Sequence, residues 1–99
     1  MIQMAITNDS GTVTITVEGR LDASTAPQLE KTLKGSLSSA HDVVLDFSNL
    51  KYISSAGIRT LLSIEKKLRN KGTVTVKNAT PQVREIMECV GVDYFLKMD

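Results

Sequence analysis

The spacing of apolar residues changes along this chain from every second residue to every third or fourth, and this change restricts the possible folds most. Apolar residues alternate with polar or small ones in two N-terminal segments: Ile2, Met4 and Ile6, and then Val13, Ile15 and Val17. Such alternation is typical of strands with one buried face. Residues 8–11 between the two segments have turn chemistry. We therefore predict a β-hairpin.

Three later segments have helical spacing. In the first, Thr25 can cap a helix with Gln28 three residues on, and Gly35 lies near its end. Its apolar residues are Ala26, Leu29, Leu33 and Leu37. The second helix is predicted from about residue 55 to 70, with the apolar stripe Ile58, Leu61, Leu62 and Leu68.

The third helix has the clearest boundaries. Thr80 is a good cap, Pro81 occupies the first helical position and Gly91 is placed to end the helix. Its predicted apolar stripe is Val83, Ile86, Met87 and Val90. Residues 94–96 are expected to form a short terminal strand or an apolar plug.

Two further apolar runs complete the set of strands. Residues 43–45 are continuously apolar, which predicts a central strand covered on both faces, and residues 46–50 lead out of it. Val74 and Val76 indicate another short strand. The order ββαβαβα, with a possible short final strand, predicts an α/β fold: an open mixed β-sheet packed with three to four helices, formed by residues 1–99 as one domain.

Composition excludes several classes of protein. The net charge is only +1, and the basic cluster Lys66, Lys67, Arg69 and Lys71 is interpreted as the solvated side of a helix, so we expect no direct nucleic-acid partner. A single cysteine, Cys89, excludes an internal disulfide and is expected to be a small buried residue. No apolar run has the ~20 residues of a membrane span and no signal peptide is visible, so a cytoplasmic location is predicted.

The sequence argues against catalysis. The only histidine, His41, precedes the central strand, and no Gly-x-Ser-x-Gly elbow or glycine-rich phosphate loop is present. The acidic residues are not at metal-ligand spacing. We therefore expect no catalytic residue, no metal and no cofactor.

Residues 46–59 read DFSNLKYISSAGIR and are unusual for a plain loop. Ser54 and Ser55 immediately precede the second helix, and the small residues Ala56 and Gly57 follow them. The first amides of a helix have no internal partners, so a phosphate on one of these serines could accept their hydrogen bonds. The alternative is structural: serine is a common cap, and small residues allow close packing against the sheet.

Four pieces of the chain, in order, resemble a known family. They are the segment GRLD at residues 19–22, the segment VLDF at 44–47 with Leu50, the segment YISSAGI at 52–58, and the third helix from Thr80–Pro81 to Val90–Gly91. The chain resembles the anti-sigma factor antagonists of the STAS domain family over essentially its whole length.

The resemblance implies a mechanism of partner switching. An unphosphorylated antagonist binds a serine kinase that also sequesters a sigma factor, and this releases the sigma factor. The kinase then phosphorylates the antagonist, and a metal-dependent serine phosphatase resets it. By motif position the phosphoacceptor is Ser55; Ser54, which stands where many members have Asp, is the fallback.

The resemblance also implies a partner-binding surface around the modified serine. Its residues are Asp22, Ser24, Ser54, Ser55, Ala56, Gly57 and Arg59. The alternative function is a non-switching STAS subunit that supports a transporter or a larger signalling assembly. The two differ in one respect: the switch requires Ser55 and the structural subunit does not.

Overall fold

The computed structural model describes residues 2–35 and 41–99. Its strands are β1 (Ile2–Asp9), β2 (Thr12–Leu21), β3 (Asp42–Ile53), β4 (Val74–Lys77) and β5 (Lys97–Met98). Its helices are α1 (Ala26–Lys34), α2 (Ser55–Leu68), α3 (Pro81–Cys89) and the short 3-10 helix η1 (Val92–Tyr94). This confirms the predicted α/β fold and its short final strand, which follows residues 94–96 rather than containing them.

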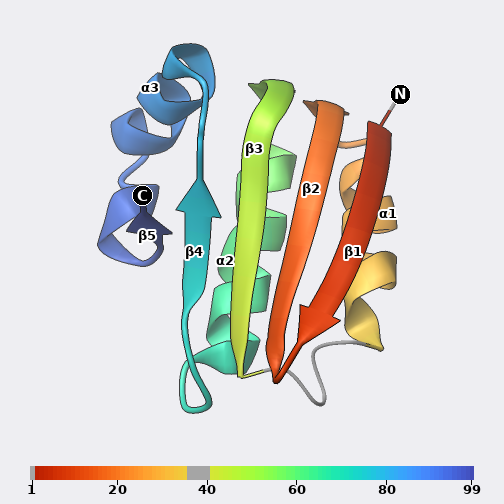
Figure 1. The fold of residues 1–99 in the computed structure, drawn as a ribbon. Coiled ribbons are helices and arrows are strands. Elements are labelled where there is room, and N and C mark those ends of the chain that lie inside the picture. The colour runs from red at the N-terminus through yellow and green to blue at the C-terminus, as the bar shows by residue number, and fades with distance from the viewer. Residues whose placement is uncertain (1, 36–40) are drawn as a thin grey trace.

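The five strands lie in the sheet in the order in which they occur in the chain (Figure 1). β1 is antiparallel to β2, and β2, β3, β4 and β5 are parallel. The hairpin turns at Ser10 and Gly11, which both have positive φ, 52° and 90°. Two such residues make the tight turn whose twist matches that of the flanking strands. The predicted hairpin is confirmed.

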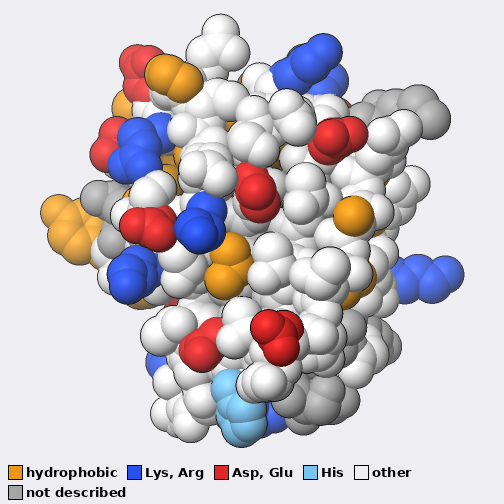
Figure 2. Space-filling model, viewed as in Figure 1, with side chains coloured by type: hydrophobic (Ala, Val, Ile, Leu, Met, Phe, Trp, Pro, Cys, Tyr) orange, Lys and Arg blue, Asp and Glu red, His pale blue; other side chains and the backbone are white. Residues whose placement is uncertain are grey.

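Helices α1 and α2 lie behind the sheet in Figure 1, and none of the helices in the described part of the chain lies in front of it. Because right-handed crossovers lead from β2 to β3 and on to β4 in one direction, they place both helices on the same face. The expectation that residues 43–45 are covered on both faces is therefore wrong: Val43 and Leu45 are buried, but Val44 is only half-buried. Figure 2 shows this uncovered face, where hydrophobic side chains form scattered patches among polar and charged ones.

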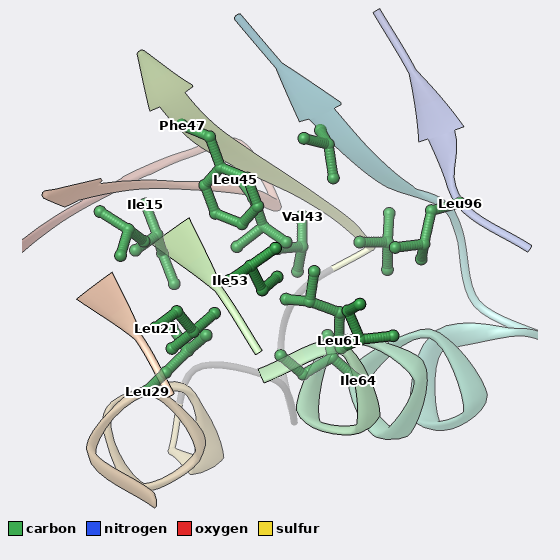
Figure 3. Packing of buried hydrophobic residues seen from close by; sticks show 14 of the residues in the cluster. Ile15, Leu21, Leu29, Val43, Leu45, Phe47, Ile53, Leu61, Ile64 and Leu96 are labelled. Atoms are coloured by element: carbon green, nitrogen blue, oxygen red, sulfur yellow. The ribbon is translucent and has the colours of Figure 1, made fainter. Parts of the chain in front are cut away.

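The core lies between the sheet and the helices. In Figure 3 strand residues point toward helix residues, among them Ile15, Leu45 and Phe47 from the sheet and Leu29, Leu61 and Ile64 from the helices. Each of these side chains is buried. At about 1.5–3 kcal/mol for each buried aliphatic side chain, this layer is the main source of stability.

Two strands are longer than expected. The alternating segment ends at Val17, and residues 46–50 were expected to lead out of the central strand, yet β2 continues to Leu21 and β3 to Ile53. The ladder between these strands shifts register on both sides of Gly19, whose φ is 103°. Such irregularities interrupt the alternation of apolar residues, so the sequence pattern ends before the strands do.

The start of α1 also differs from the prediction. Thr25 occupies the N-cap position as predicted, but its side chain makes no capping hydrogen bond, because its Oγ1 donates to the carbonyl of Arg20 at 2.7 Å and accepts from the amide of Asp22 at 2.9 Å. The carbonyl of Asp22 accepts from the amides of Thr25 and Ala26 instead. The helix ends at Gly35 as expected, and Leu37 lies outside the described residues.

In α2 the buried stripe is displaced from the predicted one. Ile58, Leu61 and Leu68 are buried as expected, but Ile64 completes the stripe and Leu62 is only partly buried. The helix ends at Leu68, two residues before the predicted end.

In α3 the predicted cap is confirmed, since Thr80 Oγ1 accepts from the amide of Val83 at 3.4 Å. The predicted burial of Val90 and Cys89 is wrong: Val90 is 59% exposed, and Cys89 is exposed. The helix ends at Cys89, and Gly91, with φ of 77°, turns the chain, so residue 90 no longer follows the buried stripe. Of residues 94–96, only Leu96 is buried.

Candidate partner-binding site at the start of helix α2

The start of α2 lies where two parallel strands end. β2 and β3 run side by side to the pair Leu21–Ile53, and the amide of Ser54 donates to the carbonyl of Leu21 at 2.8 Å. The loop that begins at Asp22 therefore lies beside the first turn of α2, as expected. Carboxyl ends of parallel strands are a common position for binding sites in α/β folds.

Gly57 allows α2 to approach β2 this closely. A Cβ atom at this position would lie 2.8 Å from the carbonyl oxygen of Leu21 and 3.0 Å from Cγ1 of Ile53. A backbone oxygen cannot move aside as the end of a flexible side chain can. The glycine is thus needed for packing, which supports the structural alternative for this one residue.

The two serines have different roles. Ser54 is the N-cap of α2: its Oγ accepts from the amide of Gly57 at 3.3 Å, and its side chain is half-buried. Ser55 is the first helical residue and is exposed, and its hydroxyl has no hydrogen-bond partner among the described residues. Ser55 is therefore the more accessible hydroxyl of the pair.

The Asp22 carboxylate is bound by its own loop. Its Oδ1 accepts from Ser24 Oγ at 2.7 Å, from the Ser24 amide at 3.0 Å and from the Thr25 amide at 3.2 Å. These hydrogen bonds, that of the Ser24 hydroxyl first, lower the pKa of Asp22 from its ordinary value. Asp22 and Ser24 thus hold the loop in shape beside α2.

An apolar pocket of about 220 Å³ lies beside the exposed serine. Its apolar lining comes from two distant parts of the chain: Ile58 and Leu62 of α2, and Val90, Val92 and Phe95 after α3. Ser55 and Arg59, one helical turn apart, line the same pocket. Arg59 is exposed, so a charged group lies next to an apolar surface.

The structure thus brings together most of the predicted residues in two adjacent groups. Ser55 and Arg59 line the pocket, while Asp22 and Ser24 form the neighbouring loop; Ala56 is half-buried in the first turn of α2. Sequence reasoning missed the pocket residues Leu62, Val90 and Phe95, because Leu62 and Val90 were assigned to the buried stripes of helices and Phe95 to a terminal strand or apolar plug. The available signal was Gly91, which was recognised as the residue that ends α3. Residues next to or beyond the end of a helix need not continue its buried apolar stripe.

Residues 2–35 and 41–99 hold neither a metal-binding cluster nor a membrane-spanning helix. They contain no cluster of three or more His, Cys, Asp or Glu side chains able to hold a metal ion. None of their helices combines the length and apolar character needed to cross a membrane.

The sequence of this chain is similar to those of known proteins. The family profile described as "Mlab, STAS domain" matches residues 4–97. BtrV of Bordetella bronchiseptica, named as a candidate anti-sigma factor antagonist, is 36% identical over 92 residues, which cover 89% of this chain and 79% of BtrV. The chain belongs to the STAS domain family, in its anti-sigma factor antagonist group.

Solved structures have the same fold as this STAS domain. An anti-sigma factor antagonist from Mycobacterium paratuberculosis has a TM-score of 0.90 at 24% identity, covering 99% of this chain and 85% of the other. SpoIIAA in its unphosphorylated form has a TM-score of 0.85 at 19% identity, covering 98% and 88%. SpoIIAA of Bacillus in its phosphorylated form has a TM-score of 0.75, covering 100% and 91% at 19% identity.

Proposed function

We propose that this STAS domain is an anti-sigma factor antagonist that acts by partner switching, with phosphorylation of Ser55 as the switch. The observation that carries the proposal is the position of Ser55: an exposed hydroxyl on the rim of an apolar pocket. The BtrV relative and the two SpoIIAA structures, one of them phosphorylated, support it. The partner is a serine kinase that also binds a sigma factor.

In the unphosphorylated state the partner covers the pocket and the first turn of α2. Burial of the apolar lining contributes binding energy at about 25 cal/mol per Å² of apolar surface. The Asp22 loop, held by its internal hydrogen bonds, forms the neighbouring part of the surface. Ser54, Ala56 and Gly57 contribute mainly by shaping this surface.

Phosphorylation of Ser55 adds a charge of roughly −2 at the edge of this surface. An unpaired charge buried in an interface costs several kcal/mol, which corresponds to a loss of over a hundredfold in affinity. The fold tolerates the phosphate, because the first amides of α2 can donate hydrogen bonds to it and Arg59 lies one turn away. Binding is therefore lost while the fold persists.

The other partners follow from the same cycle. A metal-dependent serine phosphatase removes the phosphate and restores binding. The chain itself turns over no substrate, binds no cofactor, contacts no nucleic acid and works in the cytoplasm with its kinase. The metal belongs to the phosphatase.

The switch is tested by calorimetry with the cognate kinase. Ser55→Ala should bind as tightly as the unmodified chain and resist phosphorylation, whereas the phosphorylated chain should bind over a hundredfold more weakly. Ser55→Asp should fall between them, because it carries one charge. Ser48→Ala, at another exposed serine, is the matched control and should still be phosphorylated and released.

Two outcomes would change the proposal. Equal affinity of all forms would exclude the switch and favour the non-switching STAS subunit. Loss of phosphorylation in Ser54→Ala but not in Ser55→Ala would move the site to Ser54, with circular dichroism showing that α2 survives loss of its cap.

A further inference from the structure

The outer edge of β1 is the longest open strand edge within residues 2–35 and 41–99. β1 has eight residues and pairs only with β2, whereas β5 at the other edge of the sheet has two. Figure 1 shows the two edges on opposite sides of the molecule. An open edge presents unpaired N–H and C=O groups that can bind another strand.

The register of the hairpin determines which groups of β1 face outward. The two-residue turn makes Asp9 and Thr12 a hydrogen-bonded pair, and such pairs alternate along an antiparallel ladder. The odd-numbered residues of β1 therefore bond to β2. The N–H and C=O groups that face outward belong to Ile2, Met4, Ile6 and Asn8.

This edge lacks the features that usually prevent pairing. Proteins protect open edges with charges, prolines, bulges or short strands. Residues 2–8 read IQMAITN, without a charge or a proline, and the register with β2 is regular throughout. Ile2 and Met4 are half-buried and Ile6 is 37% exposed, so the edge also has an incompletely covered apolar row.

We propose that β1 pairs antiparallel with β1 of a second copy of this chain, with the two-fold axis at Ala5. This register pairs all four outward-facing residues of β1 with one another, Ile2 with Asn8 and Met4 with Ile6, within residues 2–8. It places Met4 opposite Ile6 of the second copy on the helix side, and Gln3 opposite Thr7 on the other face. No like charges meet across the axis, so the strand is complementary to itself.

The dimer leaves the switch open. The dimer interface lies at the β1 edge of the sheet. The pocket is lined by α2 and by the segment after α3, and Figure 1 shows that segment near the opposite, β5 edge. One dimer therefore presents two Ser55 surfaces. A dimeric partner could engage both, which would raise the overall affinity without any new contact.

The first test is the mass in solution, measured by light scattering on the full chain across a range of concentrations. We expect twice the mass of one chain, falling to that of one chain for Ile6→Lys, which brings a charge into the apolar side of the dimer interface. Thr7→Lys is the matched control on the uncovered face and should remain dimeric. Circular dichroism checks that both variants are folded.

The second test locates the axis by disulfide cross-linking in a Cys89→Ser background. Ala5 faces itself in a non-hydrogen-bonded pair with Cα atoms about 4.5 Å apart, so Ala5→Cys should form a covalent dimer on oxidation. Thr7→Cys should not, because the two copies of residue 7 lie about 13 Å apart along the strands. A monomer at every concentration, or a dimer without the Ala5→Cys cross-link, would overturn the proposal.

Discussion

At Gly57 a single missing side chain determines how close α2 comes to β2. The carbonyl oxygen of Leu21 lies only 2.8 Å from the position that a Cβ atom would take, and the same oxygen accepts the hydrogen bond from the Ser54 amide that positions the helix start. Glycine is a poor helix former, costing about 1 kcal/mol relative to alanine. At this position the close packing offsets that cost.

Gly57→Ala should therefore destabilise the protein. Overpacking typically costs about 1–3 kcal/mol, and the better helix propensity of alanine returns part of it, so we expect a net loss of about 1–2 kcal/mol in urea unfolding. Gly35→Ala is the matched control, because its Cβ would meet nothing within 4 Å, and it should be neutral or slightly stabilising. A Gly57→Ala protein as stable as the unmodified chain would contradict the close approach.

At the scale of elements, a carboxylate joins the beginnings of β3 and β4. Asp42 Oδ1 accepts from the amide of Thr73 at 2.9 Å and from its hydroxyl at 3.0 Å. The backbone hydrogen bond, followed by that of the hydroxyl, lowers the pKa of Asp42 from its ordinary value. The folded state thus favours the ionised form.

This linkage predicts a loss of stability in acid. Because the pKa of Asp42 is lower in the folded state, its contribution is present above about pH 4 and is lost as pH falls through the folded value. Asp42→Asn keeps an acceptor for Thr73 but cannot titrate, so its unfolding free energy should depend less steeply on pH below 4. Equal slopes for both proteins would show that Asp42 does not contribute.

At the scale of the whole molecule, the fold joins two distant segments into one surface. Ile58 and Leu62 of α2 line the same pocket as Val90 and Phe95, which follow α3. Val90 and Phe95 are each 59% exposed, so they add little to folding stability. An exposed apolar surface of this kind is typical of an interaction site.

Phe95→Ser should separate binding from folding. Truncating a central apolar contact typically costs more than 1 kcal/mol of binding energy, so the affinity for the kinase should fall about tenfold or more, with unfolding in urea nearly unchanged. Tyr94→Ser is the matched control, because Tyr94 is 88% exposed and does not line the pocket. A larger loss of affinity from Tyr94→Ser than from Phe95→Ser would place the partner elsewhere.

The amino-acid sequence by itself determined the order of the elements and several of their boundaries. Alternation marked the hairpin, Thr80 and Pro81 marked the start of α3, and the paired serines marked the start of α2. These features are local: a turn, a cap or one apolar face depends on residues within a few positions of one another. The family motif then pointed to Ser55, whose modification stays a proposal.

Only the tertiary structure decided what each apolar residue packs against. Residue 44 was expected to be covered and is half-buried, and residue 90 was expected in the core and is exposed. Helical spacing shows that residues share a face but not whether another element covers that face. The single covered face of the sheet, the apolar pocket beside Ser55 and the open edge of β1 all follow from the direction of the crossovers and from the strand order, which are properties of the whole fold.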